Sequence, residues 1–213
     1  NEIQPFAKEG KQADYIPALA KVNPDQFGMC LSTVSGETYS IQDAETRFSI
    51  QSISKVFSIA LALSIKGEDV WNHVGKEPSG TAFNSLFQLE LEKGIPRNPF
   101  INSGAIVVAD ILMNELKDPE KDFIEFVRTL CGDSTVDYNL AIALSEREHG
   151  YLNAAIANLL KYHGCISNDI EDQMESIGVL EALGYKSKEI TWAYIYEYVF
   201  YFFHTYSSFL RRR

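Results

Sequence analysis

Hydrophobic and polar residues alternate along residues 27–50 in two runs separated by Ser35-Gly36-Glu37, which is typical of a β-hairpin. From residue 52 the period changes to that of a helix, with an apolar stripe that Gly67 ends. Loops rich in proline, glycine and asparagine separate further segments of helical period, which we expect at 86–93, 106–117, 119–130, 138–148 and 152–163. The pattern therefore predicts a mixed α/β protein that opens with antiparallel strands.

The composition of the chain changes after about residue 166. Residues 171–190 are compatible with a helix and a turn, whereas Ile190 to Phe203 is dense in tyrosine and phenylalanine. That second stretch is shorter than the roughly 20 residues that a membrane-spanning helix needs. We expect either a buried β segment there or a chain end that is not shaped for this fold.

Charge and cysteine content limit the possible partners. The chain has 213 residues and a net charge of -10, from 29 acidic and 19 basic side chains, which argues against a nucleic-acid partner. Three widely spaced cysteines, Cys30, Cys131 and Cys165, show no metal-ligand spacing, so we expect reduced thiols and no metal site. The first residues contain no apolar segment typical of a signal peptide. We therefore expect a cytoplasmic location and no membrane partner.

The segment "FSIQSISKVFS" holds the main candidate chemistry. Ser52 and Lys55 are three residues apart, which places both side chains on one face of the expected helix. A lysine among apolar residues loses hydration, which favours its neutral form, and a neutral amine can accept the proton of a serine hydroxyl. Free backbone N–H groups at the start of a helix can also face a developing oxyanion. The pattern indicates an activated serine nucleophile.

Two alternatives remain open from these residues alone. An S-x-x-K tetrapeptide is common, and the lysine of an ordinary amphipathic helix can extend its ammonium group into water. Ser58 also lies three residues from Lys55, but it is deeper in the helix and farther from the free N–H groups.

Five motifs in order carry a resemblance to a known family: "ADYIPALA", "FSIQSISKVF", "EPSGTAFNS", "NPFINSGAIVV", and "SERE" followed by "NAAIA". Together they resemble the serine-dependent glutaminases, over roughly residues 10–168. This resemblance implies a serine β-lactamase-like α/β fold, with a helical lobe and an antiparallel sheet. It also implies hydrolysis of L-glutamine to L-glutamate and ammonia through an acyl-serine, without a cofactor or metal, in a homo-oligomer.

The resemblance assigns roles to six residues of this chain. It implies that Ser52 is the nucleophile, that Lys55 is its proton partner, and that the substrate is bound by Tyr15, Ser52, Asn102, Glu146 and Asn153. A free amino acid carries an ammonium group, which a carboxylate such as Glu146 would bind, and a carboxylate, which neutral amides would bind. Without the family, Asn102 is equally compatible with a turn, Glu146 with a solvated helix face, and Tyr15 with packing.

The resemblance ends near residue 168, which divides the chain into a glutaminase-like region at 1–168 and a divergent tail at 169–213. The family's later tyrosines and its Lys-Ser-Gly-Val-type strand are not found there, and Lys186-Ser187-Lys188 is only superficially similar to that strand. We therefore expect a sheet that is incomplete at its C-terminal side. The pattern is typical of a truncated chain with an unrelated tail, as a frameshift would give, and a genuine variant remains open.

The preferred function is therefore glutaminase. The alternatives are a catalytically impaired or inactive homologue and another β-lactamase-like serine amidohydrolase.

Overall fold

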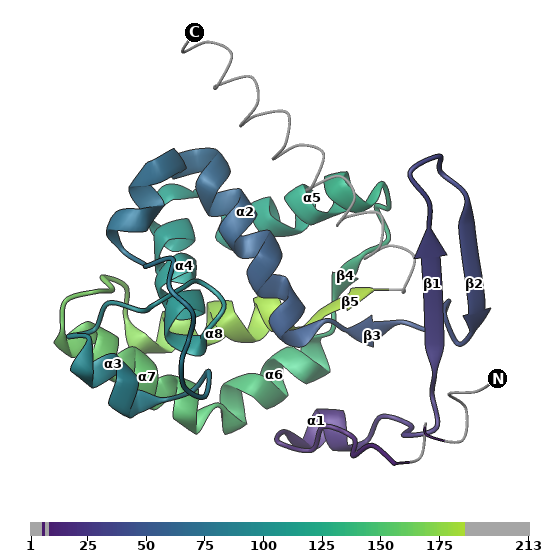
Figure 1. The fold of residues 1–213 in the computed structure, drawn as a ribbon, viewed down its shortest axis with the longest axis horizontal. Coiled ribbons are helices and arrows are strands. Elements are labelled where there is room, and N and C mark those ends of the chain that lie inside the picture. Colours follow the sequence, from purple (N-terminus) through teal and green to yellow (C-terminus); the bar gives the residue numbers. More distant parts are fainter. Residues whose placement is uncertain (1–5, 7–8, 186–213) are drawn as a thin grey trace, which may run out of the picture.

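The computed structural model describes residue 6 and residues 9–185; the expectation for Ile190 to Phe203 lies outside these residues. Helices form one lobe of the molecule, and the strands lie toward the other side (Figure 1). The helices are α1 (Pro17–Ala20), α2 (Ser54–Lys66), α3 (Leu86–Leu91), α4 (Asn102–Glu115), α5 (Pro119–Cys131), α6 (Leu140–His149), α7 (Tyr151–Tyr162) and α8 (Ile170–Glu181). Two short 3-10 helices flank α2: η2 (Gln51–Ile53) precedes it and η3 (Gly67–Asn72) follows it. The strands are β1 (Gly28–Ser32), β2 (Thr38–Gln42), β3 (Phe48–Ser49), β4 (Asp137–Tyr138) and β5 (Leu183–Tyr185).

The predicted hairpin is confirmed as the antiparallel pair β1–β2. Gly36 has φ 91°, a left-handed conformation that glycine adopts without a steric penalty, and this allows the tight turn. The register pairs Met29 with Ile41 and Leu31 with Tyr39. These four apolar side chains are all exposed, so the hairpin buries little of its own apolar surface within the described residues.

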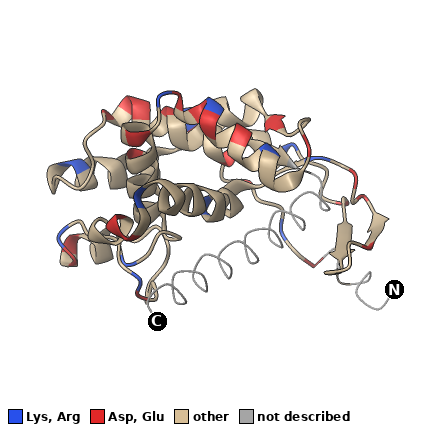
Figure 2. Cartoon of the chain, turned by 90° about the horizontal axis from the view of Figure 1, so that it is seen from above, with Lys and Arg blue, Asp and Glu red and all other residues tan. Residues whose placement is uncertain are grey.

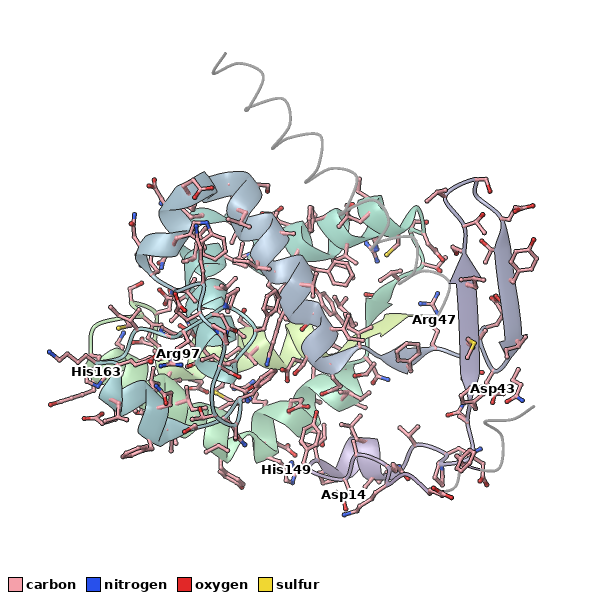
Figure 3. The ribbon with its side chains drawn as sticks, viewed as in Figure 1. Asp14, Asp43, Arg47, Arg97, His149 and His163 are labelled. Atoms are coloured by element: carbon pink, nitrogen blue, oxygen red, sulfur yellow. The ribbon has the colours of Figure 1, made fainter. Side chains whose placement is uncertain are left out.

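A second sheet joins three segments that are far apart in sequence. Its order is β3–β5–β4, and both pairings are antiparallel, with Ser49 opposite Gly184 and Asp137 opposite Gly184. Arg47 reinforces this arrangement, because its guanidinium donates to the Gly184 carbonyl (3.2 Å) and to Thr135 Oγ1 (2.6 Å) (Figure 3). The sheet therefore brings the C-terminal end of α8 beside the residues that precede α2.

Helix α4 forms the centre of the helical lobe. Its "GAIVVADIL" segment is apolar on nearly all sides, and residues 106–112 are all buried, as expected for a helix surrounded by others. Gly104 is required by packing, because a Cβ there would lie 1.9 Å from the Asn98 carbonyl oxygen. The loop before α4 can thus pass directly against the helix.

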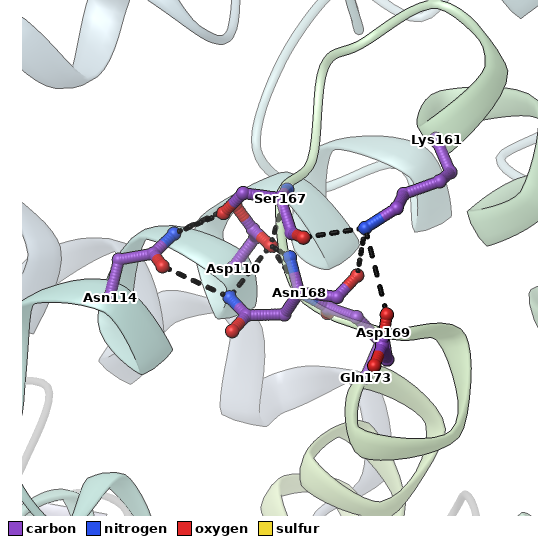
Figure 4. A network of polar contacts seen from close by, with 7 residues as sticks. All are labelled: Asp110, Asn114, Lys161, Ser167, Asn168, Asp169 and Gln173. Carbon is purple, nitrogen blue, oxygen red and sulfur yellow. Dashed lines mark hydrogen bonds and ion pairs between the residues drawn. The ribbon is translucent and has the colours of Figure 1, made fainter.

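Asp110 connects α4 to the segment that leads into α8 (Figure 4). Its buried carboxylate accepts hydrogen bonds from the backbone N–H groups of Ser167 (3.0 Å) and Asn168 (2.9 Å). It also accepts from the side chains of Asn168 (2.9 Å) and Gln173 (2.7 Å), and from Asn114 (3.0 Å). A buried carboxylate with this many donors fixes the start of α8 relative to the core.

Several element boundaries differ from the sequence-based expectations. The expected helix at 52–66 begins only at Ser54, after a 3-10 turn, and α4 begins at Asn102 instead of residue 106. Asp137 and Tyr138, where we expected a helix to start, form β4, because long-range pairing with β5 overrides local propensity. The helix expected after residue 170 is confirmed as α8.

Acidic and basic side chains are interspersed over the helices (Figure 2). In the described part of the chain, no helix combines the length and apolar character needed to cross a membrane.

Candidate active site

Ser52 lies in η2, immediately before α2, and its side chain is exposed. The residue before it, Gln51, has φ 48°, an uncommon conformation for a residue with a side chain. This backbone geometry turns the chain sharply between β3 and α2. The N–H of Ser54 donates back to the Gln51 carbonyl, so one of the helix-start N–H groups that we expected to be free is already bonded.

Lys55 is buried in the first turn of α2, with 5% of its surface exposed. Its Nζ donates to Asn102 Oδ1 (2.8 Å) and to the Phe100 carbonyl oxygen (3.2 Å). Burial lowers the pKa of Lys55, and the negative charge of Glu181 partly opposes this effect. The alternative that Lys55 extends into water is therefore wrong.

The loop before α4 presents the two acceptors of Lys55. Asn98 Oδ1 accepts from the backbone N–H groups of Phe100 (3.0 Å) and Ile101 (3.2 Å), which shapes the "NPFIN" turn. The backbone N–H of Asn102 donates to the Phe83 carbonyl (2.9 Å), in the "PSGTAFNS" segment. Two sequence motifs thus combine to hold one face of the site.

Asn102 connects the lysine to α7. It accepts from Lys55 through Oδ1 and donates through Nδ2 to Asn153 Oδ1 (2.9 Å). Asn153 lies in the first turn of α7. Lys55, Asn102 and Asn153 therefore form a continuous hydrogen-bonded series from three helices, and Asn102 is more than a turn residue.

Tyr15 reaches the site from the segment before α1. Ile16 is buried against α6, and the N–H of Ala18 donates to Ser145 Oγ (3.3 Å), which anchors this segment. The Tyr15 hydroxyl donates to Gln51 Oε1, beside Ser52. Burial, and then the negative charges of Glu146 and Glu181, raise the pKa of Tyr15, which keeps the phenol protonated at neutral pH.

Glu146 is buried on α6, with 5% of its surface exposed, and its Oε1 has no hydrogen-bond partner among the described residues. Burial raises the pKa of this carboxyl group, and the neighbouring Tyr15 hydroxyl partly opposes this effect. The solvated-face alternative for Glu146 is therefore wrong. A buried carboxylate oxygen without a hydrogen-bond partner is costly, and a cationic ligand would supply that partner.

Sequence reasoning missed two residues of this cluster, Gln51 and Glu181. Gln51 adjoins Ser52, and its Nε2 also donates to Ser49 Oγ (2.5 Å). Glu181 is the last residue of α8, and no local pattern marks it, because only the β3–β5 pairing brings it to the site. Across residues 9–185, no three His, Cys, Asp or Glu side chains come together as metal ligands would.

Comparison with known proteins decides the family. The glutaminase family profile matches residues 10–195. The chain belongs to the glutaminase family. A curated glutaminase of Cronobacter sakazakii is 48% identical over 196 residues, which is 92% of this chain and 64% of that protein. This family member spans between 53% and 64% of the length of the curated relatives that it matches.

Solved structures agree with this family assignment. A probable glutaminase, ybaS, superposes with a TM-score of 0.79 at 28% identity, covering 89% of this chain and 65% of that one. The protein Mglu in its glutamate form gives a TM-score of 0.81 at 29% identity, covering 90% of this chain and 44% of that one. The fold of this family member is therefore mixed α/β and β-lactamase-like, as predicted.

Proposed function

We propose that this chain carries the active site of a glutaminase, which hydrolyses L-glutamine to L-glutamate and ammonia through an acyl-serine on Ser52. The observation that supports it most directly is the series Lys55–Asn102–Asn153 beginning one turn from Ser52. The relatives named glutaminase and the neighbour solved in its glutamate form support the same substrate.

The two hydrogen bonds of Lys55 suit a proton acceptor. A neutral amine has two N–H donors and one lone pair, and the two donors suffice for Asn102 and Phe100. The lone pair then remains for the Ser52 proton. Ser52 Oγ attacks the side-chain amide carbon of glutamine, the amide nitrogen leaves as ammonia with that proton, and water hydrolyses the acyl-serine to glutamate.

The remaining residues would hold the amino-acid end of the substrate. The Glu146 carboxylate, whose Oε1 has no hydrogen-bond partner among the described residues, fits the substrate ammonium, with Tyr15 as its neighbour. The amides of Asn102 and Asn153 can donate to the substrate carboxylate. No step of this reaction needs a cofactor or metal.

The preferred setting is the cytoplasm, in a homo-oligomer. Cys30 and Cys165 are free thiols, which suits a reducing compartment, and the oligomer follows from the family resemblance.

Replacement of the nucleophile tests the proposal. Ser52→Ala should remove nearly all ammonia release from L-glutamine, because no other group can form the acyl intermediate. Ser64→Ala is the matched control, since Ser64 is exposed near the far end of the same helix and should leave turnover unchanged. Ser58 donates to the Ser54 carbonyl (3.1 Å) within the core. Wild-type turnover in Ser52→Ala, or loss only in Ser58→Ala, would refute the assignment.

A further inference from the structure

The Ser49 hydroxyl uses both its donor and its acceptor. It donates to the backbone carbonyl oxygen of Glu181 (3.2 Å), and it accepts from Gln51 Nε2 (2.5 Å). Ser49 is half-buried in β3, and Glu181 is the last residue of α8. One hydroxyl therefore joins the end of α8 to the residue directly before Ser52.

The Glu181 carbonyl determines the direction of these hydrogen bonds. A backbone carbonyl can only accept, so the single proton of the Ser49 hydroxyl is committed to it. Ser49 must then accept from Gln51, which turns Nε2 of that amide toward Ser49 and leaves Oε1 for another donor. The Tyr15 hydroxyl donates to this Oε1. The Gln51 amide is therefore held from both sides in one of its two orientations.

Gln51 is held in this way at a point where the backbone conformation is uncommon. Its φ is 48°, in the left-handed region that a residue with a side chain seldom adopts and that persists where the surroundings hold it. The backbone on either side is also fixed, because the N–H of Ile50 donates to the Leu183 carbonyl (3.0 Å) and the N–H of Ile53 donates to the Ile50 carbonyl (3.0 Å). Ser52 follows Gln51 directly, so the left-handed turn at Gln51 sets where the Ser52 side chain lies.

We propose that Ser49 is a positioning residue for the nucleophile: its hydroxyl, anchored on the Glu181 carbonyl, holds the Gln51 amide and thereby the left-handed turn that places Ser52. The proposal rests on the proposed function for the role of Ser52. Ser49 acts through Gln51 and needs no contact with the substrate. Its anchor lies beyond residue 168, in a part of the chain to which the sequence motifs assign no role.

NMR tests this arrangement without any turnover. Protein labelled at glutamine with carbon-13 and nitrogen-15 reports the Gln51 side-chain amide and, through the Cα shift, the Gln51 backbone; both signals are identified by their loss in Gln51→Glu. In Ser49→Ala the amide protons should move toward the shifts of a solvated glutamine, and the Cα shift should leave the value of a left-handed residue, because the amide has lost its acceptor. Ser49→Thr keeps a hydroxyl and should keep both signals close to their wild-type positions.

Ser40→Ala is the matched control, because Ser40 is an exposed serine of the strand β2. It should leave both Gln51 signals and the turnover unchanged. Unmoved Gln51 signals in Ser49→Ala, or equal movement in Ser40→Ala, would overturn the proposal. If Ser49→Ala does not fold, Ser49→Cys keeps a side chain of similar shape with a weaker hydrogen-bonding group, and the same outcomes apply.

A double-mutant cycle shows whether Ser49 acts through Gln51. At equal concentrations of folded protein, Ser49→Ala should lower kcat for L-glutamine about tenfold or more, because a misplaced nucleophile reacts slowly. In a Gln51→Gly background the same substitution should cost much less, because glycine adopts a left-handed φ freely and has no amide to hold. An equal loss in both backgrounds would show that Ser49 only joins β3 to α8, and would overturn the proposal.

Ammonia release separates this proposal from the proposed function. Moved Gln51 signals in a protein without turnover would support the hold of Ser49 on the turn before Ser52 and reject the glutaminase assignment. Turnover with unmoved signals would reject the role of Ser49 alone.

Discussion

At the residue scale, the site depends on polar side chains that are buried in defined surroundings. Lys55 has two acceptors and little contact with water, whereas Glu146 is equally buried and has one oxygen without a partner. The energetic difference is large, because an unpaired buried polar group costs about 1–3 kcal/mol and a charged one more. This difference supports the proposed roles of Lys55 in proton transfer and of Glu146 in binding a ligand that carries a positive charge.

Neutralising Glu146 should weaken substrate binding. Glu146→Gln keeps the shape of the side chain but removes a charge-assisted hydrogen bond to the substrate ammonium, worth about 1.5–3 kcal/mol. We expect glutamine affinity, measured by calorimetry, to fall roughly ten- to a hundredfold. Glu148→Gln is the control, because Glu148 is exposed on the same helix. Unchanged affinity in Glu146→Gln would place the ammonium elsewhere.

At the scale of elements, α8 is the component on which the geometry of the site depends. It contacts α6 beside Glu146 through Gly178 and ends at Glu181. Its start is held by Asp110, and its end is held by β5 pairing with β3. The division between residues 1–168 and 169–213 remains a prediction, yet the hydrogen bond that Asp110 accepts from Gln173 crosses that boundary.

Removing the charge of Asp110 should destabilise this connection. Asp110→Asn replaces one acceptor oxygen by a donor. In place of Oδ1 that donor faces the side-chain donors of Asn168 and Gln173, and in place of Oδ2 it faces those of Ser167 and Asn114. We expect the free energy of unfolding to fall by about 1–3 kcal/mol, because buried donors lose their acceptor.

Urea denaturation measures this effect as a lower midpoint at an unchanged m-value. Asp25→Asn, on the exposed segment before β1, is the control and should leave the midpoint unchanged. An unchanged midpoint in Asp110→Asn would show that the network contributes little to stability.

At the scale of the whole molecule, the strands form two separate sheets. The hairpin β1–β2 does not pair with β3–β5–β4 among the described residues, and its apolar side chains Met29, Leu31, Tyr39 and Ile41 are exposed. The relatives are longer than this chain, which spans 53% to 64% of their length. The resemblance implies that the family's Lys-Ser-Gly-Val-type strand supplies the second oxyanion N–H, and it stays a prediction that residues 169–213 hold no counterpart of this strand.

The 213-residue chain should therefore turn over glutamine slowly. Loss of one preorganised oxyanion donor typically costs about 10² to 10³ in rate, so ammonia release should be lower by at least that factor than in the Cronobacter sakazakii relative. Both proteins are assayed side by side at equal concentrations of folded protein. Comparable turnover would contradict this expectation and show that another part of the chain replaces the missing donor.

The sequence by itself determined the local features of this protein. Gly36 predicts the hairpin, since a tight turn needs a left-handed residue, and the apolar stripe from residue 53 predicts α2. The ordered motifs identify the family, whereas the common face of Ser52 and Lys55 that their spacing predicts stays a prediction. These features depend on residues that are close in sequence, so they can be predicted from a local or periodic sequence pattern.

Only the tertiary structure decided which polar groups are buried and what they face. Glu146 looks like a surface residue beside Arg147 and Glu148, yet the close packing of α6 on α8 removes it from water. Glu181 joins the site because β5 pairs with β3, more than a hundred positions earlier in the chain. Burial and long-range pairing depend on the packing of segments that are distant in sequence, so a local sequence pattern does not predict them. The same packing sets the pKa shifts of Lys55, Glu146 and Glu181.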